Sequence, residues 1–225
     1  MVFRGLVLPS KLTVNHTNEE QTMKKSNNTN FEMPEGHEEI SKSFYDEIWN
    51  GNEYGQYGVC VEKGDIVLDC GSNIGIFTDY AIFNGASKVY AFEADQLIHG
   101  SHVKNFPQSE TSIVKSFNSK VGIGEDHVSL HDIFGITGEN HFDFAKLDIE
   151  GAEYDLLLKT PQIVLQKIDK WAIEFHLWGY HENSATELKL LMQIIEKFNV
   201  AGFNTYLAHI HVGWNMIMFF AEKRR

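Results

Sequence analysis

The chain has 225 residues, a length that favours a single domain with a core large enough to need no metal or disulfide support. Its 31 acidic residues outnumber 19 lysines and arginines, and the formal net charge of −12 repels phosphate backbones and anionic membranes. No apolar stretch approaches the roughly 20 residues of a membrane span. Only two cysteines occur, Cys60 and Cys70, and they form no CxxC pair, which is typical of reduced thiols in a cytoplasmic protein. We therefore expect a cytoplasmic globular protein that has neither nucleic acid nor a membrane as its partner.

The N-terminal part of the chain differs in composition from the rest. Between residues 9 and 36 it is rich in Asn, Thr, Lys and Glu and has few apolar side chains. Such a segment cannot bury enough surface to fold alone. We predict a flexible or loosely docked arm over residues 1–36 and one folded domain over residues 37–225.

Beyond the arm, helical patterns alternate with apolar runs that are typical of buried strands. The first helix is indicated by the spacing of Ile40, Phe44, Ile48 and Trp49. Further helices are expected at 76–85, 96–106 and 188–198, the last with a capping box of Ser184 and Glu187 before it and Gly202 after it. Strands are expected at 65–70, 88–94, 112–117, 142–150, 170–178, 203–210 and 214–223.

The alternation of strands and helices predicts the fold class. Strands that are almost uniformly apolar indicate a parallel sheet with helices on both faces. The last two strands follow each other with no room for a crossover helix, so they should pair antiparallel. We expect a doubly wound α/β fold with a mostly parallel seven-stranded sheet, one antiparallel strand, and ligands beyond the carboxyl ends of the strands.

The first strand ends in the stretch "LDCGSNIGIF", which contains a glycine turn. Gly71 and Gly75 allow a tight turn and a close backbone approach to a ligand, and the following helix offers free N–H groups. The order of the glycines does not fit the GxGxxG fingerprint of dinucleotide sites. Asp69 also places a carboxylate where a cofactor phosphate would lie. The turn therefore favours a cofactor with a cationic amine, or else a purely structural turn in which Asp69 caps the helix.

The second strand ends in "AFEAD", which places Glu93 about one βαβ unit after the glycine turn. An acid at this position can accept hydrogen bonds from both ribose hydroxyls of an adenosine ligand. The alternative is a solvated charge at a strand end. The combination of Asp69, the glycine turn and Glu93 is more specific than any one of them.

The stretch "FDFAKLDIEGAEYDLLL" brings two carboxylates to the end of the fourth strand. Asp148 and Glu150 are two residues apart, so they share a side if the extended backbone continues. Gly151 permits a turn into the next helix, whose first turn suits Glu153. Since the fourth strand should adjoin the first, we expect both acids to face a ligand pocket rather than the core.

The fifth strand carries a further polar pair in "AIEFH". Glu174 and His176 alternate with apolar residues and share one face of the strand. A histidine near a strand end suits a general base. A histidine that is hydrogen-bonded within a packed loop is an alternative of nearly equal weight.

Several of these stretches together are similar to one known family. "NEYGQY", "VLDCGSNIGIF", "KVYAFEAD", "HVSLHDIF", "DFAKLDIEGAEYDLL" and "IEFH" resemble the FkbM-type family of S-adenosylmethionine-dependent methyltransferases over roughly residues 50–222. The resemblance implies a Rossmann-like class I methyltransferase fold and the cofactor S-adenosylmethionine. It also implies methyl transfer to a hydroxyl oxygen of a sugar, polyketide or related metabolite, so that the substrate is a small molecule or a glycan.

The resemblance also implies roles for particular residues. The cofactor is expected at Asp69, Gly71, Ser72, Asn73, Gly75, Glu93, Ala94, Ser119 and Asp148, with Glu93 on the ribose and Ser119 near the adenine. An alcohol is a poor nucleophile, and the candidates for the base are Asp148, Glu150 and His176. A divalent cation on Asp148, Glu174 and His176 would resemble catechol O-methyltransferase, but the spacing differs, so no metal is expected.

Two other classes of protein remain as alternatives. One is a catalytically silent S-adenosylmethionine-binding module that serves as a scaffold. Such a module would share the glycine turn and Glu93, whereas Glu150 and His176 favour an enzyme. The other is a nucleotide-dependent oxidoreductase, which Asp69 and the missing middle glycine disfavour.

Overall fold

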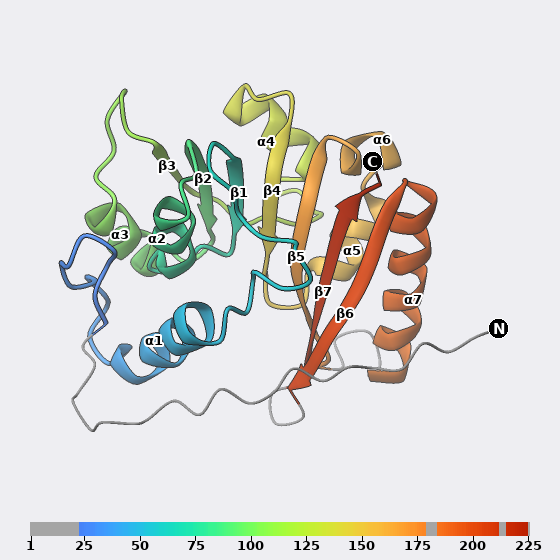
Figure 1. Cartoon of the computed structure of the whole chain (residues 1–225), viewed down its shortest axis with the longest axis horizontal. Coiled ribbons are helices and arrows are strands. Elements are labelled where there is room, and N and C mark those ends of the chain that lie inside the picture. The colour runs from blue at the N-terminus through green and yellow to red at the C-terminus, as the bar shows by residue number, and fades with distance from the viewer. Residues whose placement is uncertain (1–22, 179–183, 212–214, 225) are drawn as a thin grey trace.

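The computed structural model describes residues 23–178, 184–211 and 215–224. In this part of the chain seven strands form one sheet in the order β3-β2-β1-β4-β5-β7-β6 (Figure 1). The strands are β1 (Ile66–Cys70), β2 (Lys88–Glu93), β3 (Val114–Asn118), β4 (Phe142–Leu147), β5 (Ile168–His176), β6 (Phe203–His211) and β7 (Met216–Lys223).

The pairing of the strands confirms the predicted mostly parallel sheet with one reversed strand. The first five strands pair in parallel, with β1 between β2 and β4. Strand β7 runs antiparallel to both of its neighbours, β5 and β6. The carboxyl ends of β1 and β4 therefore lie side by side, because Cys70 is in register with Leu147.

Helices cover both faces of the sheet. Their bounds are α1 (Glu38–Tyr45), which continues as the π-helical turn η1 (Asp46–Asn50), α2 (Ile76–Phe83), α3 (Gln96–Asn105), α4 (Leu130–Thr137), α5 (Glu153–Lys159), α6 (Gln162–Leu165) and α7 (Ser184–Val200). One buried cluster joins the sheet to α4, α5, α6 and α7, and a second joins it to η1 and α2. Successive strand residues point to opposite faces, so Val67 belongs to the second cluster and Leu68 to the first.

Two helices were not predicted, and one predicted strand is shorter than expected. Helix α4 starts with a capping box of Ser129 and Asp132, a local signal that the apolar periodicity of this segment does not reveal. Helix α6 has only four residues. Strand β4 ends at Leu147 rather than at residue 150. Helix α7 begins at Ser184, but the side chain of that residue lies outside the described part of the structure.

Residues 23–36, the described part of the predicted arm, contact α2 and α3. The Ser26 backbone N–H and hydroxyl donate to the two carboxylate oxygens of Asp79, at 2.6 and 2.9 Å. The Asn105 side chain accepts from the Glu32 N–H at 2.7 Å and donates to the Glu32 carbonyl at 2.8 Å. Phe31 is buried in the second cluster.

None of the helices in the described ranges combines the length and the apolar character that a membrane crossing requires.

Candidate active site

A cavity of about 680 Å³ lies at the carboxyl ends of the parallel strands. Its volume is within the range of small-molecule sites, about 300–1,000 Å³. Among the predicted site residues, those that line it are Gly71, Ser72, Asn73, Glu93, Ala94, Ser119, Asp148, Glu150 and His176. Asp69 and Gly75 are not among the lining residues. Ile40 and Phe44 of helix α1 also line the cavity, as do Trp178 and Met216.

The turn after β1 needs glycine because the end of β4 approaches it closely. Gly71 has a φ of +77°, and a Cβ atom on it would overlap the backbone oxygen of Asp148. The Asp148 N–H donates to the carbonyl of Cys70 at 3.1 Å, which ties the two strand ends together. The glycine turn and the first acid of the "DIEGAE" stretch therefore meet at one point of the sheet edge.

Glu93 organises the cavity wall formed by the turn. One of its carboxylate oxygens accepts from the Asn73 N–H at 2.9 Å, and the other accepts from the Asp95 N–H at 2.8 Å. Each oxygen retains a further lone pair, because a carboxylate has about four acceptor sites. Glu93 is half-buried and held in place, with acceptor capacity left for a ligand.

Asp69 lies beneath the cavity rather than in its wall. Its side chain is fully buried, accepts from the Thr78 hydroxyl at 2.7 Å, and lies 3.6 Å from the Lys146 ammonium. Burial raises the pKa of Asp69, and Lys146 opposes that effect. The structural alternative for this residue was a helix cap; the structure instead shows it bonded to a side chain inside α2.

Lys146 belongs to the candidate site, although the sequence alone assigned it no role. Its buried ammonium lies 3.2 Å from Asp148 and also donates to the carbonyl of Gly71. Burial lowers the pKa of Lys146, but Asp148 and Asp69 outweigh this effect, so the net pKa is raised and the residue stays charged. One cation thus holds two acids and the glycine turn together. The position of the lysine in "KLDIEGAE" was the available signal.

Tyr54 was also missed. Its hydroxyl lies 3.2 Å from Asp148 Oδ2 and 2.9 Å from Glu174 Oε2. Burial raises the pKa of Tyr54, and the charges of Asp148 and Glu174 add to that effect, so its hydroxyl stays protonated and can donate. The signal for Tyr54 in the sequence was its place in "NEYGQY".

His176 ends β5 among four carboxylates. Its Nδ1 lies 3.2 Å from Glu153 Oε1. Its Nε2 lies 3.5 Å from Glu174, 3.7 Å from Glu150 and 3.9 Å from Asp148. Burial alone would lower the pKa of His176, but the bond to Glu153 and the nearby acids raise it to about 9. Burial and the charge of Asp148 raise the pKa of Glu174 to about 9 as well.

Glu153 fixes the turn between β4 and α5. Its Oε1 accepts from the N–H groups of Ile149 and Gly151, at 2.9 and 3.1 Å, as well as facing His176. The prediction that Glu153 suits the first turn of a helix is correct, since it is the first residue of α5. Its hydrogen bonds, however, point back to the turn rather than along the helix.

The sheet order and the fold as a whole are shared with solved structures of methyltransferases. One similar solved structure is the ribosomal protein L11 methylase from Lactobacillus delbrueckii subsp. bulgaricus, with a TM-score of 0.54 and 12% identity over 92% of this chain and 91% of that one. An rRNA methylase from Streptococcus thermophilus has a TM-score of 0.52 and 13% identity over 83% of this chain and 95% of that one. A methyltransferase from Pyrococcus furiosus has a TM-score of 0.50 and 17% identity over 83% of this chain and 84% of that one. In a further match, to another Streptococcus thermophilus protein, this chain spans 64% of that protein's length.

The family is given by the sequence. Residues 99–204 match the model of the methyltransferase FkbM domain, which confirms the resemblance. The match to this family's model supports methyl transfer in general, with S-adenosylmethionine as the cofactor. No protein of curated function matches the chain in sequence.

The residues in the cavity fit this cofactor. The Ser72 hydroxyl lines the cavity, is buried, and has no hydrogen-bond partner among the described residues. A buried hydroxyl without a partner is costly, so a ligand that bonds to it is favoured. Glu93 has acceptor capacity for hydroxyl groups, and the acids around Asp148 suit a positively charged ligand. The cavity therefore provides contacts for an adenosyl ribose and for a cationic centre.

Proposed function

We propose that this protein transfers the methyl group of S-adenosylmethionine to a hydroxyl oxygen of a sugar or another small metabolite, on a Rossmann-like class I methyltransferase fold. The observation that carries the proposal is the single cavity in which the glycine turn and Glu93 face Asp148, Glu150 and His176. Such a reaction requires a wall that binds the cofactor and candidate proton acceptors for the hydroxyl group, both at one cavity.

The proposed cofactor contacts follow the cavity wall. Glu93 accepts from the ribose, the turn of Gly71, Ser72 and Asn73 surrounds the methionine part, and Ala94 and Ser119 lie toward the adenine. Asp69 and Gly75 act indirectly in this proposal. Asp69 holds Lys146, and Gly75 lets the turn pass closely over Phe106.

The proposed chemistry is an in-line displacement. S-adenosylmethionine supplies a methyl group on a positively charged sulfur. The acceptor oxygen forms a bond to the methyl carbon as the carbon–sulfur bond breaks, and the electron pair of that bond stays on sulfur. The hydroxyl proton passes to a group in the cavity wall, for which Asp148, Glu150 and His176 are the candidates. Because its pKa is raised to about 9, His176 can accept this proton only in alkaline solution. The protein mainly positions the two reactants and excludes water.

The acceptor class is argued from charge. Two of the structurally similar proteins are named as methylases of rRNA and of a ribosomal protein, but the identity is 12–13% and the likeness is one of fold. The net charge of −12 opposes binding to a phosphate backbone. We therefore propose a small-molecule or glycan acceptor rather than RNA.

Methyl-labelled S-adenosylmethionine, incubated with the protein and a panel of glycans and small alcohols, tests the proposal. Label in a hydroxyl-bearing acceptor is expected. Cofactor binding without transfer to any acceptor, with label found nowhere but in the cofactor, would instead favour a non-catalytic scaffold. Tight binding of NADH with no binding of S-adenosylmethionine would overturn the assignment altogether.

The site residues have their own test. Asp148→Asn is expected to lower turnover by about 100-fold or more, because base catalysis contributes about that much. His176→Ala should have a similar effect. Circular dichroism must show that both variants remain folded. Full activity in both variants would remove these residues from the reaction.

A further inference from the structure

The Nε2 atom of His176 faces three carboxylates at an unusual separation. The distances of 3.5 to 3.9 Å to Glu174, Glu150 and Asp148 are too long for good hydrogen bonds. Two ligand atoms at about 2.1 Å from one cation, in tetrahedral arrangement, lie about 3.4 Å apart. The spacing therefore suits atoms that coordinate one cation better than atoms joined by a direct hydrogen bond. The ligand atoms of Asp148, Glu150 and His176 all lie within 4.8 Å of one another.

The other ring nitrogen of His176, Nδ1, faces a carboxylate, as is common for histidines that bind a metal. The His176 side chain is 3% exposed, and its Nδ1 lies 3.2 Å from the fully buried Glu153 carboxylate. Because Glu153 also accepts two backbone N–H groups, it is held as an acceptor, and Nδ1 donates to it. Such a carboxylate–histidine pair fixes the ring and directs Nε2 outward. Here Nε2 is directed at the cavity.

The backbone conformation also directs Glu150 toward the Nε2 atom of His176. Glu150 has a φ of +58°, and Gly151 follows with +96°. A left-handed conformation at a residue other than glycine costs about 1–3 kcal/mol and persists only where the surroundings impose it. Glu153 imposes it by accepting from the residues on both sides of Glu150. The result is a carboxylate whose side chain is 65% exposed yet lies 3.7 Å from the buried His176.

Asp148 is held in place through the carboxylate oxygen that does not face His176. Its Oδ2 is held by Lys146 at 3.2 Å and by the Tyr54 hydroxyl at 3.2 Å. The Oδ1 atom remains on the side of His176, at 3.9 Å from Nε2. Glu153 thus positions His176 directly and Glu150 through the left-handed turn, while Lys146 and Tyr54 position Asp148.

We propose that Asp148, Glu150 and His176 bind a divalent cation at the acceptor side of the cavity. Two carboxylate oxygens and one imidazole nitrogen form a ligand set that suits Mn²⁺ or Zn²⁺, since imidazole favours transition metals. Three protein ligands leave coordination positions open, as in catalytic metal sites.

The role of this cation rests on the proposed function. An acceptor hydroxyl at an open position becomes more acidic, because the cation withdraws electron density from its oxygen. The three ligands then no longer serve as the base, and the hydroxyl proton passes to solvent water, which reaches the cavity beside the 65% exposed side chain of Glu150. The oxygen next bonds to the methyl carbon, and the electron pair of the broken carbon–sulfur bond remains on sulfur.

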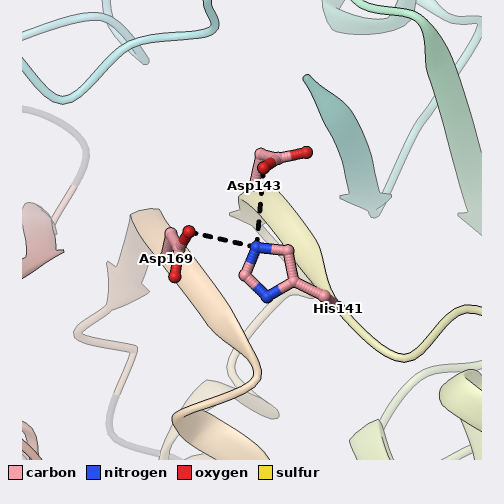
Figure 2. A group of neighbouring side chains, drawn as sticks. All are labelled: His141, Asp143 and Asp169. Atoms are coloured by element: carbon pink, nitrogen blue, oxygen red, sulfur yellow. Dashed lines mark ion pairs between the residues drawn. The ribbon is translucent and has the colours of Figure 1, made fainter. Parts of the chain in front are cut away.

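A second cluster of similar composition serves as the control. Figure 2 shows His141 between Asp143 and Asp169, at the amino ends of β4 and β5, with its Nε2 3.5 and 3.0 Å from the two acids. These acids already have partners. Asp143 accepts from the Ile66 N–H at 2.7 Å, and Asp169 pairs with the ammonium of Lys223. The His141 side chain is also 41% exposed, whereas that of His176 is 3% exposed.

Titration of the full chain with Mn²⁺ alone, followed by the electron paramagnetic resonance signal of free Mn²⁺, tests the proposal. One saturable Mn²⁺ per chain is expected. Glu150→Gln should weaken its binding at least tenfold, whereas His141→Ala should leave it unchanged. Because the Glu150 side chain is mostly exposed, the fold should survive its replacement, and circular dichroism checks this. Asp148→Asn provides a second reading at the same site.

Absence of saturable Mn²⁺ binding in the wild type, equal binding in Glu150→Gln, or loss of binding in His141→Ala would each overturn the cation site. Calorimetry with S-adenosylmethionine on the metal-free protein tests the proposed function separately. Cofactor binding without Mn²⁺ binding rejects only the cation. Mn²⁺ binding lost on Glu150→Gln, together with no cofactor binding, supports the cation site and rejects the methyltransferase assignment of the cavity.

Discussion

Glu93 ends β2 with both carboxylate oxygens bonded to backbone N–H groups, and this arrangement gives the residue two functions. It shapes the glycine turn through Asn73, and in our proposal it accepts from the ribose. The sequence predicted only the second function, because its bond to Asn73 joins residues 20 positions apart.

Replacement of Glu93 tests the ribose contact. Glu93→Ala is expected to weaken S-adenosylmethionine binding by more than about 1 kcal/mol, because hydrogen bonds to a charged group are lost. Calorimetry measures the change. Glu110→Ala, which removes an exposed acid outside the cavity, is the matched control. Equal affinity in the two variants would contradict the assignment.

Gly71 provides a second test at the scale of one residue. Gly71→Ala is expected to destabilise the protein by more than about 2 kcal/mol, because it adds a clash with the Asp148 backbone to the cost of a positive φ. Gly138 has a similar φ of +73° but open space around it, so Gly138→Ala should cost only about 1 kcal/mol. Urea unfolding of both variants measures the difference. Equal decreases in the free energy of unfolding would mean that the clash with the Asp148 backbone adds no destabilisation.

At the scale of elements, α3 is joined to the site through a buried chain of hydrogen bonds. His102 of α3 has Nε2 at 3.2 Å from the Thr78 hydroxyl, which donates to Asp69, and Nδ1 at 3.1 Å from Ser116 of β3. Burial, with a contribution from His99, lowers the pKa of His102 to about 3. The imidazole is therefore neutral in the folded protein at every pH near neutrality.

This lowered pKa predicts a loss of stability in acid. The unfolded chain binds a proton at His102 below its ordinary pKa of about 6.5, whereas the folded protein does so only near pH 3. The free energy of unfolding should therefore fall as the pH decreases from about 6.5 toward 3. The contribution of His102 is about 2 kcal/mol between pH 7 and pH 5.

Urea unfolding at pH 7, 6 and 5 measures this slope. His102→Gln, which keeps a polar side chain but does not titrate, should give a shallower slope than the wild type. Identical slopes would show that His102 has the same pKa in the folded and the unfolded chain.

At the scale of the whole molecule, the segment of residues 23–36 packs beside the turn of the cofactor wall. Asn105 links them, because its side chain bonds to Glu32 and also donates to the carbonyl of Ile74 at 2.9 Å. Ile74 follows Asn73 of the glycine turn. Docking of the segment and the shape of the cavity wall thus depend on one buried amide.

Asn105→Ala is expected to lower the free energy of unfolding by about 1–3 kcal/mol, since it leaves the buried carbonyl of Ile74 and the partly buried backbone groups of Glu32 without this partner. Thermal unfolding and limited proteolysis within residues 23–36 measure the effect. Thr29→Ala, in the same segment and exposed, is the control. An unchanged melting temperature together with unchanged proteolysis would show that the segment does not depend on Asn105.

The sequence by itself determined the order and type of the main elements, because the apolar periodicity of strands and helices is a local property. It also placed the turn after β1, Glu93 and Asp148 at one edge, since the carboxyl ends of parallel strands must lie together. The short helices α4 and α6 lacked a strong periodic signal and were missed.

Only the tertiary structure decided how the charges are arranged. It placed Asp69 beneath the cavity, gave Lys146 two acidic partners, and brought Tyr54 to Glu174, 120 positions away in the chain. It also turned His176 so that one nitrogen meets Glu153 and the other faces the cavity. These contacts depend on side-chain direction and on packing between distant segments, and the period of a sequence pattern carries no information about either.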